Sequence, residues 1–149
     1  MQKHINLEFL CEQESNPILL RYFPGKIAAG FPSPAADYAE EEIDFNQYLR
    51  PRPLSTYVVR VKGDSMIDAH IPDNALLIVD RSVKPVSNMI VIAVIDGEFT
   101  VKRFIRNSSG IRLMPANLRY PPIPITEGMD FSIWGTVTKI IIDAIKTAS

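Results

Sequence analysis

The fold is decided by the stretch MIVIAVIDGEFTVKRF, which occupies residues 89–104. Two apolar, β-branched runs lie on either side of Asp96-Gly97, and runs of this kind form strands. Both central residues of a type I′ turn need positive φ, and Asp-Gly is a dipeptide that such a turn favours. We therefore predict a β-hairpin over Met89–Phe104 with its turn at Asp96-Gly97.

Further strand signals lie on both sides of this hairpin. Apolar and polar residues alternate from Thr56 to Lys62, as in a half-buried strand. The other β-branched runs are Leu76–Val79, Ile111–Met114 and Phe131–Ile145, the last as one long strand or as a pair broken near Gly135. The sequence predicts a mainly β body in which strands outnumber helices.

The first fifty residues differ from the rest in charge and in proline content. They carry four Lys and Arg against eight Asp and Glu, whereas the remaining residues carry twelve against nine. Prolines and glycines gather between residues 17 and 34, where each proline disfavours a helix at the residue before it. We expect a largely extended, cleavable N-terminal arm and linker over residues 1–52 and a folded domain over residues 53–149. Within the arm, Ser33-Pro34 predicts the start of a helix over Ala35–Leu49.

Composition excludes several classes of protein. The formal net charge of −1 gives no electrostatic footprint for a polyanion, so direct nucleic-acid binding is not expected. Cys11 is the single cysteine, so it cannot form an internal disulfide or a cysteine-based metal site, which suits a reducing cytoplasm. The charge-free apolar run Pro85–Ile95 is too short to span a bilayer. We predict a cytoplasmic protein without a membrane anchor, a cofactor or a metal.

One tight turn carries a candidate nucleophile. Gly63-Asp64-Ser65-Met66 directly follows a predicted strand, although such a turn on its own is more often a simple β-turn whose side chains bond their own backbone. A serine nucleophile needs a base, and the ordinary partner is histidine. His4 and His70 are the only histidines, and neither has a clear orienting acid nearby. A histidine-based triad is therefore not favoured.

The other available base is a lysine that is held neutral. Lys102 lies in the predicted strand Glu98–Phe104, where its side chain points opposite to that of Arg103, so one of these two cations faces inward. The strand pattern does not choose between them, and an exposed lysine is the ordinary alternative. Proton transfer near neutral pH requires the lysine pKa to fall by roughly 3 units from about 10.4, which demands desolvation. An apolar β body supplies that environment, and backbone N–H groups of Gly63–Ser65, Ser65 first among them, are the predicted oxyanion donors.

Four stretches carry a family resemblance, namely residues 30–38 (GFPSPAADY), 63–68 (GDSMID), 76–80 (LLIVD) and 96–102 (DGEFTVK). In order and spacing they resemble UmuD-like proteins, which are members of the LexA-like self-cleaving serine peptidases. The resemblance implies a LexA-like peptidase body with Ser65 as nucleophile, Lys102 as base and cleavage of the Ala29–Gly30 bond. Two departures are Ala29, where UmuD-like proteins commonly have cysteine, and Asp73-Asn74, where a Gly-Asp pair is usual.

The resemblance also implies a role and partners. UmuD-like proteins form homodimers, cleave themselves when a RecA–single-stranded DNA filament stimulates them, and then join a UmuC-type Y-family translesion DNA polymerase in the SOS response. Two alternatives stay open: a phage-type repressor fragment that lacks its DNA-binding domain, and a non-catalytic module that recruits a polymerase. No pair of periodic helices in residues 1–55 suggests a helix-turn-helix, which speaks against a LexA-type repressor.

Overall fold

The structure is a computed structural model that describes residues 16–35 and 40–145. The chain divides into two compact units, Met1–Leu54 and Ser55–Ser149. Each unit has its own antiparallel sheet. The second unit holds the residues of the candidate site.

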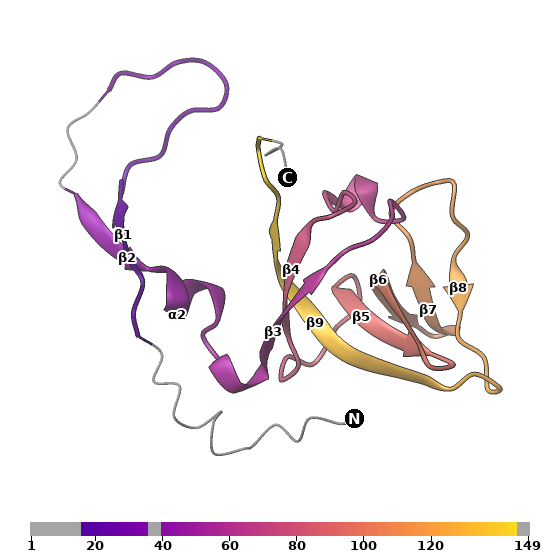
Figure 1. Cartoon of the computed structure of the whole chain (residues 1–149). Helices are drawn as coiled ribbons and strands as arrows, with labels where there is room; N and C mark the ends of the chain where they lie inside the picture. The colour runs from indigo at the N-terminus through magenta and orange to yellow at the C-terminus, as the bar shows by residue number, and fades with distance from the viewer. Residues whose placement is uncertain (1–15, 36–39, 146–149) are drawn as a thin grey trace. The chain divides into compact units, whose positions relative to one another are not determined.

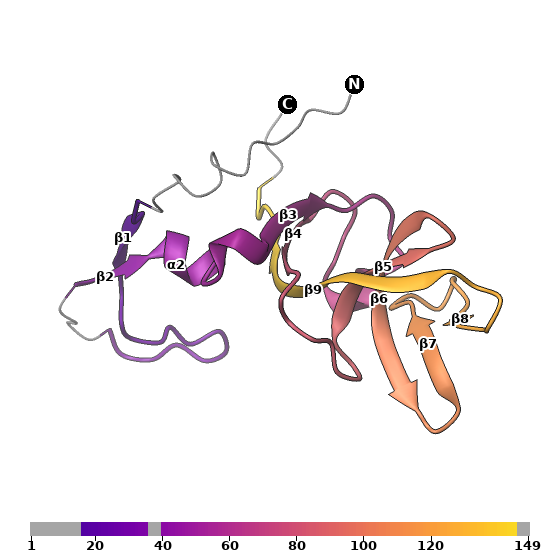
Figure 2. The same ribbon diagram turned by 90° about the horizontal axis from the view of Figure 1, so that it is seen from below.

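A seven-stranded antiparallel sheet forms the second unit, with strand order β3-β4-β9-β5-β6-β7-β8. Figures 1 and 2 show this sheet as strongly curved, with the long β9 lying between β4 and β5. Its strands are β3 Thr56–Arg60, β4 Leu76–Asp80, β5 Ile90–Ile95, β6 Glu98–Asn107, β7 Gly110–Met114, β8 Ile123–Pro124 and β9 Phe131–Ile141. Short 3-10 helices occupy Pro53–Ser55 (η1) and Ile67–Ala69 (η2). The prediction of a mainly β, LexA-like body is confirmed.

The predicted hairpin is present as β5 and β6. Ile95 pairs with Glu98, so the turn consists of Asp96 and Gly97. Their φ angles are 48° and 84°, the positive values that a type I′ turn requires. The hairpin therefore fixes which residues of β6 face the same side as Lys102.

The terminal strand is one continuous strand and not a pair broken near Gly135. β9 continues through Gly135 and pairs with β4 on one side and β5 on the other. The register shifts on the β5 side between Ile92 and Ala93, opposite Gly135. A Cβ at Gly135 would lie 2.5 Å from Cγ1 of Val79 on β4, so a side chain at position 135 would require the buried Val79 side chain to move.

The core beneath the site includes residues from the loop between β3 and β4. Met66 and Ile71 are 2% and 0% exposed and pack with Leu77, Val79 and Ile92. Burial of one such side chain stabilises the fold by about 1.5–3 kcal/mol. Because Met66 is anchored in this way, the position of its neighbour Ser65 follows the rigid sheet.

The first unit corrects the prediction of a helix over Ala35–Leu49. Glu41–Asp44 forms strand β2, which pairs with an unpredicted strand β1, Leu19–Tyr22, and only Phe45–Leu49 is helical (α2). Asp44 Oδ1 accepts hydrogen bonds from the N–H groups of Asn46 and Gln47, so Asp44 rather than Ser33 caps the helix. The part of the predicted helix at residues 36–39 lies outside the described residues.

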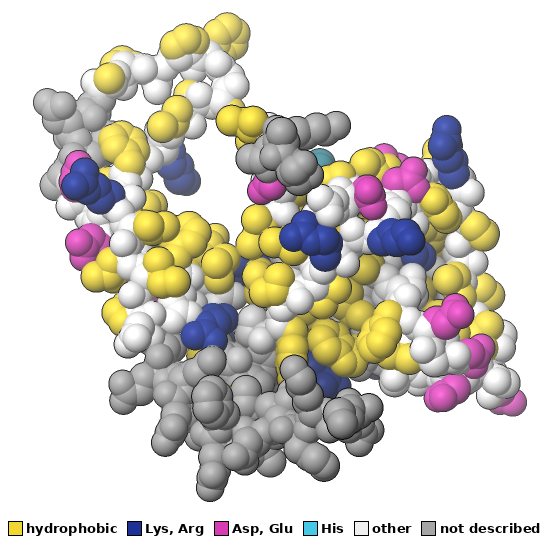
Figure 3. All heavy atoms as spheres, viewed as in Figure 1, with side chains coloured by type: hydrophobic (Ala, Val, Ile, Leu, Met, Phe, Trp, Pro, Cys, Tyr) yellow, Lys and Arg dark blue, Asp and Glu magenta, His cyan; other side chains and the backbone are white. Residues whose placement is uncertain are grey.

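Two surface properties bear on function. Within residues 16–35 and 40–145, no helix is long and apolar enough to cross a membrane. On the face seen in Figure 3, the Lys and Arg side chains of the described residues lie scattered among acidic and hydrophobic ones. The described side chains in this view therefore form no continuous basic surface for a nucleic-acid backbone.

Candidate active site

The candidate nucleophile lies in a tight turn after β3. Gly63 has φ of 98°, a conformation that side chains rarely adopt, and its N–H donates to Asp73 Oδ1 at 2.7 Å. Helix η2 follows at once, with the Ile67 N–H donating to the Asp64 carbonyl at 3.1 Å. Ser65 is half-buried between these two anchors, so its hydroxyl projects from a fixed backbone.

Lys102 faces inward from the middle of β6. Its side chain is only 8% exposed, and its backbone pairs with that of the buried Val91. Arg103 points to the other side, where its Nη1 donates to the Asn88 carbonyl at 2.6 Å. The strand pattern did not decide which of the two cations faces inward, and the structure shows that it is Lys102.

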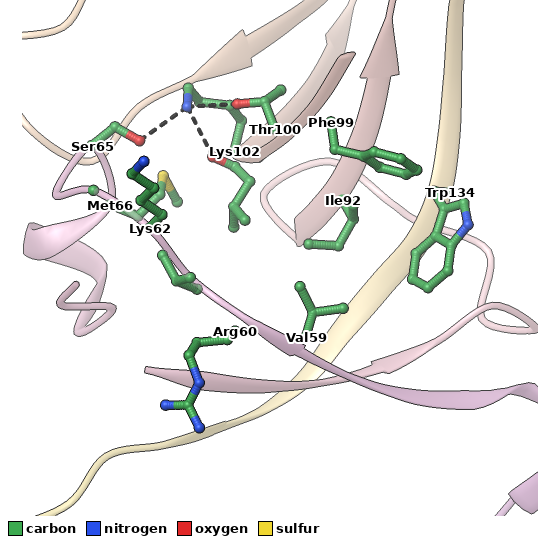
Figure 4. Close-up of a pocket in the computed structure, with 13 residues that line it drawn as sticks. Val59, Arg60, Lys62, Ser65, Met66, Ile92, Phe99, Thr100, Lys102 and Trp134 are labelled. Atoms are coloured by element: carbon green, nitrogen blue, oxygen red, sulfur yellow. Dashed lines mark hydrogen bonds between the residues drawn. The ribbon is translucent and has the colours of Figure 1, made fainter. Parts of the chain in front are cut away.

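Three polar atoms surround the Lys102 amine (Figure 4). Nζ donates to Ser65 Oγ at 3.0 Å, to Thr100 Oγ1 at 2.9 Å and to the Val101 carbonyl at 3.0 Å. None of these partners is a carboxylate, and burial lowers the pKa of Lys102 from its ordinary value of 10.5. A neutral amine donates two hydrogens, which suit Thr100 and Val101, and its lone pair is then directed at the Ser65 hydroxyl.

A pocket of about 470 Å³ extends from this pair of residues. Ser65 and Lys102 lie at one end, while Phe99 and Trp134 lie at the other (Figure 4). Its remaining lining residues are Val59, Arg60, Val61, Lys62, Gly63, Met66, Ile92, Thr100 and Val101. An apolar groove that ends in a few polar groups is typical of a ligand site.

The edge strand β3 forms one wall of the pocket. β4 is its one neighbour in the sheet of the described residues, so the outer edge of β3 has no second strand beside it. Residues Val59–Lys62 on this strand and just after it line the pocket. An extended peptide can add to such an edge through main-chain hydrogen bonds. The pocket therefore suits an extended chain segment that runs along β3 toward Ser65.

The structure excludes one of the backbone N–H groups that were predicted as oxyanion donors. The Gly63 N–H already donates to the Asp73 carboxylate, so Gly63 is not available as a donor. The Ser65 N–H, the first candidate, stays in the set. Asn74 adopts φ of 72°, so asparagine accommodates the left-handed turn at the position where the resemblance departs.

The other residues that the sequence singled out belong to other parts of the chain. Ala29 and Gly30 are exposed residues of the first unit, and the described residues 23–35 around them form no helix or strand. His70 is exposed and ends helix η2, while His4 lies outside the described residues. Among the side chains that the structure describes, no three His, Cys, Asp or Glu gather as a metal site would require.

Thr100 and Asp73 contact the Ser65–Lys102 site in ways that the sequence did not predict. Thr100 lies two positions before Lys102 on the same strand, so both side chains face the same side. The i, i+2 spacing of Thr100 and Lys102 in a predicted strand is therefore a sequence signal that could have identified Thr100. Asp73 bonds to Gly63, which lies ten positions earlier in the chain, and no short motif marks such a contact.

A curved β body whose groove ends at a serine bonded to a buried lysine is typical of self-cleaving serine peptidases of the LexA-like class. The chain belongs to the peptidase S24-like family, whose sequence pattern matches residues 21–138. It is 45% identical over 130 residues to Protein SamA of Salmonella typhimurium, covering 87% of this chain and 90% of SamA. It is 42% identical over 127 residues to Protein ImpA of Escherichia coli (80% of this chain, 81% of ImpA) and 40% identical over 123 residues to Protein MucA of Escherichia coli (82% and 84%).

These relatives are UmuD-like proteins, so the resemblance inferred from the four motifs is confirmed. The chain is thus a mutagenesis-related protein in a family of self-cleaving serine peptidases.

Proposed function

We propose that the chain is a self-cleaving UmuD-like subunit of an error-prone translesion DNA polymerase in the SOS response. Ser65 and Lys102 cut the Ala29–Gly30 bond, which removes the arm and activates the protein for mutagenesis. The observation that carries the proposal is the 3.0 Å contact between Lys102 Nζ and Ser65 Oγ at the end of an apolar groove. Membership of the S24-like family supports it.

The reaction begins with proton transfer. Neutral Lys102 Nζ takes the hydroxyl proton of Ser65 as Ser65 Oγ attacks the carbonyl carbon of Ala29. The negative charge moves to the carbonyl oxygen, where the Ser65 N–H donates to it. The tetrahedral intermediate collapses, the bond from Ala29 to Gly30 breaks, and Lys102 passes its proton to the nitrogen of Gly30. An ester between Ala29 and Ser65 Oγ remains.

Water completes the cycle. Lys102, neutral again, takes a proton from a water molecule, whose oxygen attacks the ester carbon of Ala29. The second tetrahedral intermediate collapses, and Lys102 returns the proton to Ser65 Oγ. The products are a chain that ends in the Ala29 carboxylate and a chain that begins with the Gly30 amine.

The cleaved segment suits the groove by its small side chains. Ala28, Ala29 and Gly30 let the backbone lie close to Ser65, and Pro32 keeps the following segment extended. Cleavage within the same molecule or within a dimer raises the effective concentration of this segment, so a slow peptidase still processes itself. This favours self-cleavage over digestion of other proteins.

The proposed partners follow from the UmuD-like relatives. We propose a cytoplasmic homodimer that binds a UmuC-type Y-family polymerase and is stimulated by a RecA–single-stranded DNA filament. Contact with DNA is indirect, which accords with a net charge of −1 and with the scattered basic side chains of Figure 3.

The test is mass spectrometry of the purified full chain after incubation at alkaline pH. We expect two fragments, residues 1–29 and 30–149, from the wild type, and an intact chain from Ser65→Ala. A wild-type chain that stays whole at every pH, with and without RecA filament, would favour the non-catalytic polymerase-recruiting module instead. Specific binding to one DNA sequence in a parallel assay would favour the repressor fragment.

A further inference from the structure

The connection between β7 and β8, residues 115–122, lies against the turn that carries Ser65. The Ala116 N–H donates to the Ser65 carbonyl at 2.8 Å, and the Ala116 carbonyl accepts from the Asp68 N–H at 2.8 Å. One residue of the connection is therefore bonded to the backbone on both sides of Met66. These contacts join parts of the chain that are about fifty positions apart.

Two side chains of the same connection hold Asp64, the residue before the nucleophile. Asn117 Nδ2 donates to the Asp64 carbonyl at 3.0 Å, and the Tyr120 hydroxyl donates to Asp64 Oδ1 at 2.6 Å. Asn117 is itself fixed, because its Oδ1 accepts from the Arg119 N–H at 3.0 Å and its carbonyl accepts from the Tyr120 N–H at 3.1 Å. The β7–β8 connection therefore binds both the backbone carbonyl and the side chain of Asp64.

The bond to the Asp64 carbonyl has a direct consequence for catalysis. That carbonyl and the Ser65 N–H belong to one planar trans peptide, so they point in opposite directions. The Asp64 carbonyl accepts from two donors, the Ile67 N–H of the same turn at 3.1 Å and Asn117 Nδ2 at 3.0 Å. Asn117 thus adds the contact from outside the turn that helps to fix the direction of the Ser65 N–H, the proposed oxyanion donor. Oxyanion donors act only when they are aimed at the place where the charge develops.

We propose that Asn117 and Tyr120 are positioning residues that act through Asp64 to aim the Ser65 N–H and hydroxyl at the scissile carbonyl. The proposal deepens the proposed function and rests on it. Neither residue touches Lys102, whose three partners are Ser65, Thr100 and Val101. Their loss should therefore slow the chemical step without altering the protonation of the base.

The chain offers a matched control for each residue. Asn107 Oδ1 accepts from the Ser109 N–H at 2.9 Å, the same local bond that Asn117 makes, but Asn107 is the last residue of β6, just before the β6–β7 turn. Tyr57 is an exposed tyrosine of the same unit that packs on Trp134. Asn107→Ala and Tyr57→Phe thus remove the same atoms as Asn117→Ala and Tyr120→Phe without touching Asp64.

The experiment measures self-cleavage of the full chain against pH for the wild type and these four variants, together with the thermal midpoint of each. We expect the plateau rate to fall about 10-fold in Asn117→Ala and about 3-fold in Tyr120→Phe, since loss of a whole oxyanion donor costs about 100-fold or more. The apparent pKa of the rise should match the wild type. Both control variants should keep the wild-type plateau.

Three results would count against these roles. Plateau rates equal to those of the controls would overturn the positioning role while the proposed function stands. A plateau that falls together with a displaced apparent pKa or a large drop in midpoint would show a general structural role, and it would also overturn the proposal. A wild type that never cleaves would overturn the proposed function itself, and the positioning role with it.

Discussion

Lys102 Nζ lies 3.0 Å from Ser65 Oγ, although the two residues are 37 positions apart in the chain. The contact is held from both sides by rigid structure. Met66, next to Ser65, is buried in one core cluster, and Lys102 is paired within the central hairpin opposite Val91. Side chains that are held by rigid elements keep their relative geometry even when no substrate is bound.

The first prediction concerns this pair. Ser65→Ala and Lys102→Ala should each lower the rate of self-cleavage by at least about 1,000-fold, because nucleophile and base act as one unit, and the double variant should be no slower than either single one. Arg103→Ala is the matched control, since Arg103 is the neighbouring cation on the opposite face of β6. The rate at which fragments appear on a denaturing gel measures self-cleavage in the wild type and the four variants. Cleavage by either single variant near the wild-type rate would exclude the pair as the catalytic groups.

Thr100 gives the second prediction. Its hydroxyl accepts a hydrogen bond from Lys102 Nζ at 2.9 Å, so it orients the amine toward Ser65. Thr100→Val keeps the shape of the side chain but loses the acceptor. The plateau rate should fall about 10-fold, which is part of the roughly 100- to 10,000-fold that general acid–base catalysis contributes, because the base is misoriented but still present. The ammonium form loses a partner as well, so the apparent pKa should move down. Thr100→Ser should restore both values, and a Thr100→Val chain with the wild-type profile would contradict this orienting role.

Much of this arrangement could be predicted from local sequence, and the failures share a physical cause. The Asp96-Gly97 turn and the β-branched runs around it are local signals, and the hairpin formed where they indicated. Strand β1 was missed because prolines flank it at positions 17 and 24 and its residues are exposed. The helix prediction failed over Glu41–Asp44 because pairing with β1 outweighs local helix signals there.

The residues of the candidate site likewise divide into those that local sequence marks and those that only long-range contacts bring together. Ser65 and Lys102 lie within short motifs, so a single sequence marks them. Asn117 and Tyr120 reach Asp64 across 53 and 56 positions, and contacts of that range leave no periodicity or spacing to read. Which of Lys102 and Arg103 faces inward also depends on the register of β6 against β5, which pairing in the folded sheet decides.

The third prediction is about stability. Lys102 is buried with a lowered pKa, so the folded chain releases its proton at a lower pH than the unfolded chain. Between the two pKa values unfolding takes up a proton, and this residue's contribution to stability therefore rises with pH. Lys102→Met removes the buried charge and should raise the free energy of unfolding by about 1 kcal/mol near neutral pH, with a smaller gain at alkaline pH.

Denaturant unfolding at two pH values measures this effect. The exposed Lys62 supplies the control, since Lys62→Met should change stability by less than about 0.5 kcal/mol at either pH. A Lys102→Met chain that is less stable than the wild type at neutral pH would mean that the buried amine is stabilised by its partners rather than penalised by desolvation.

The last prediction concerns the pH dependence of cleavage without a stimulating filament. Only neutral Lys102 takes the Ser65 proton, so the rate should rise about tenfold per pH unit while the lysine is mostly protonated. It should level off once the pH exceeds the lysine pKa, which burial lowers from 10.5. A histidine base would level off near its ordinary pKa of about 6.5. The number of protons lost should be one.

A RecA filament should move this profile toward neutral pH. If the filament stabilises the docked arm, the arm excludes water from the groove, and further desolvation lowers the pKa of Lys102 more. The measurement is the initial rate of fragment formation by mass spectrometry at constant ionic strength, on chains shown to be folded at each pH. A rate that is flat from about pH 6 to about pH 10 would rule out lysine as the base. If the rate rises with pH but the filament does not shift the profile, the filament acts on a step other than the exclusion of water from the groove.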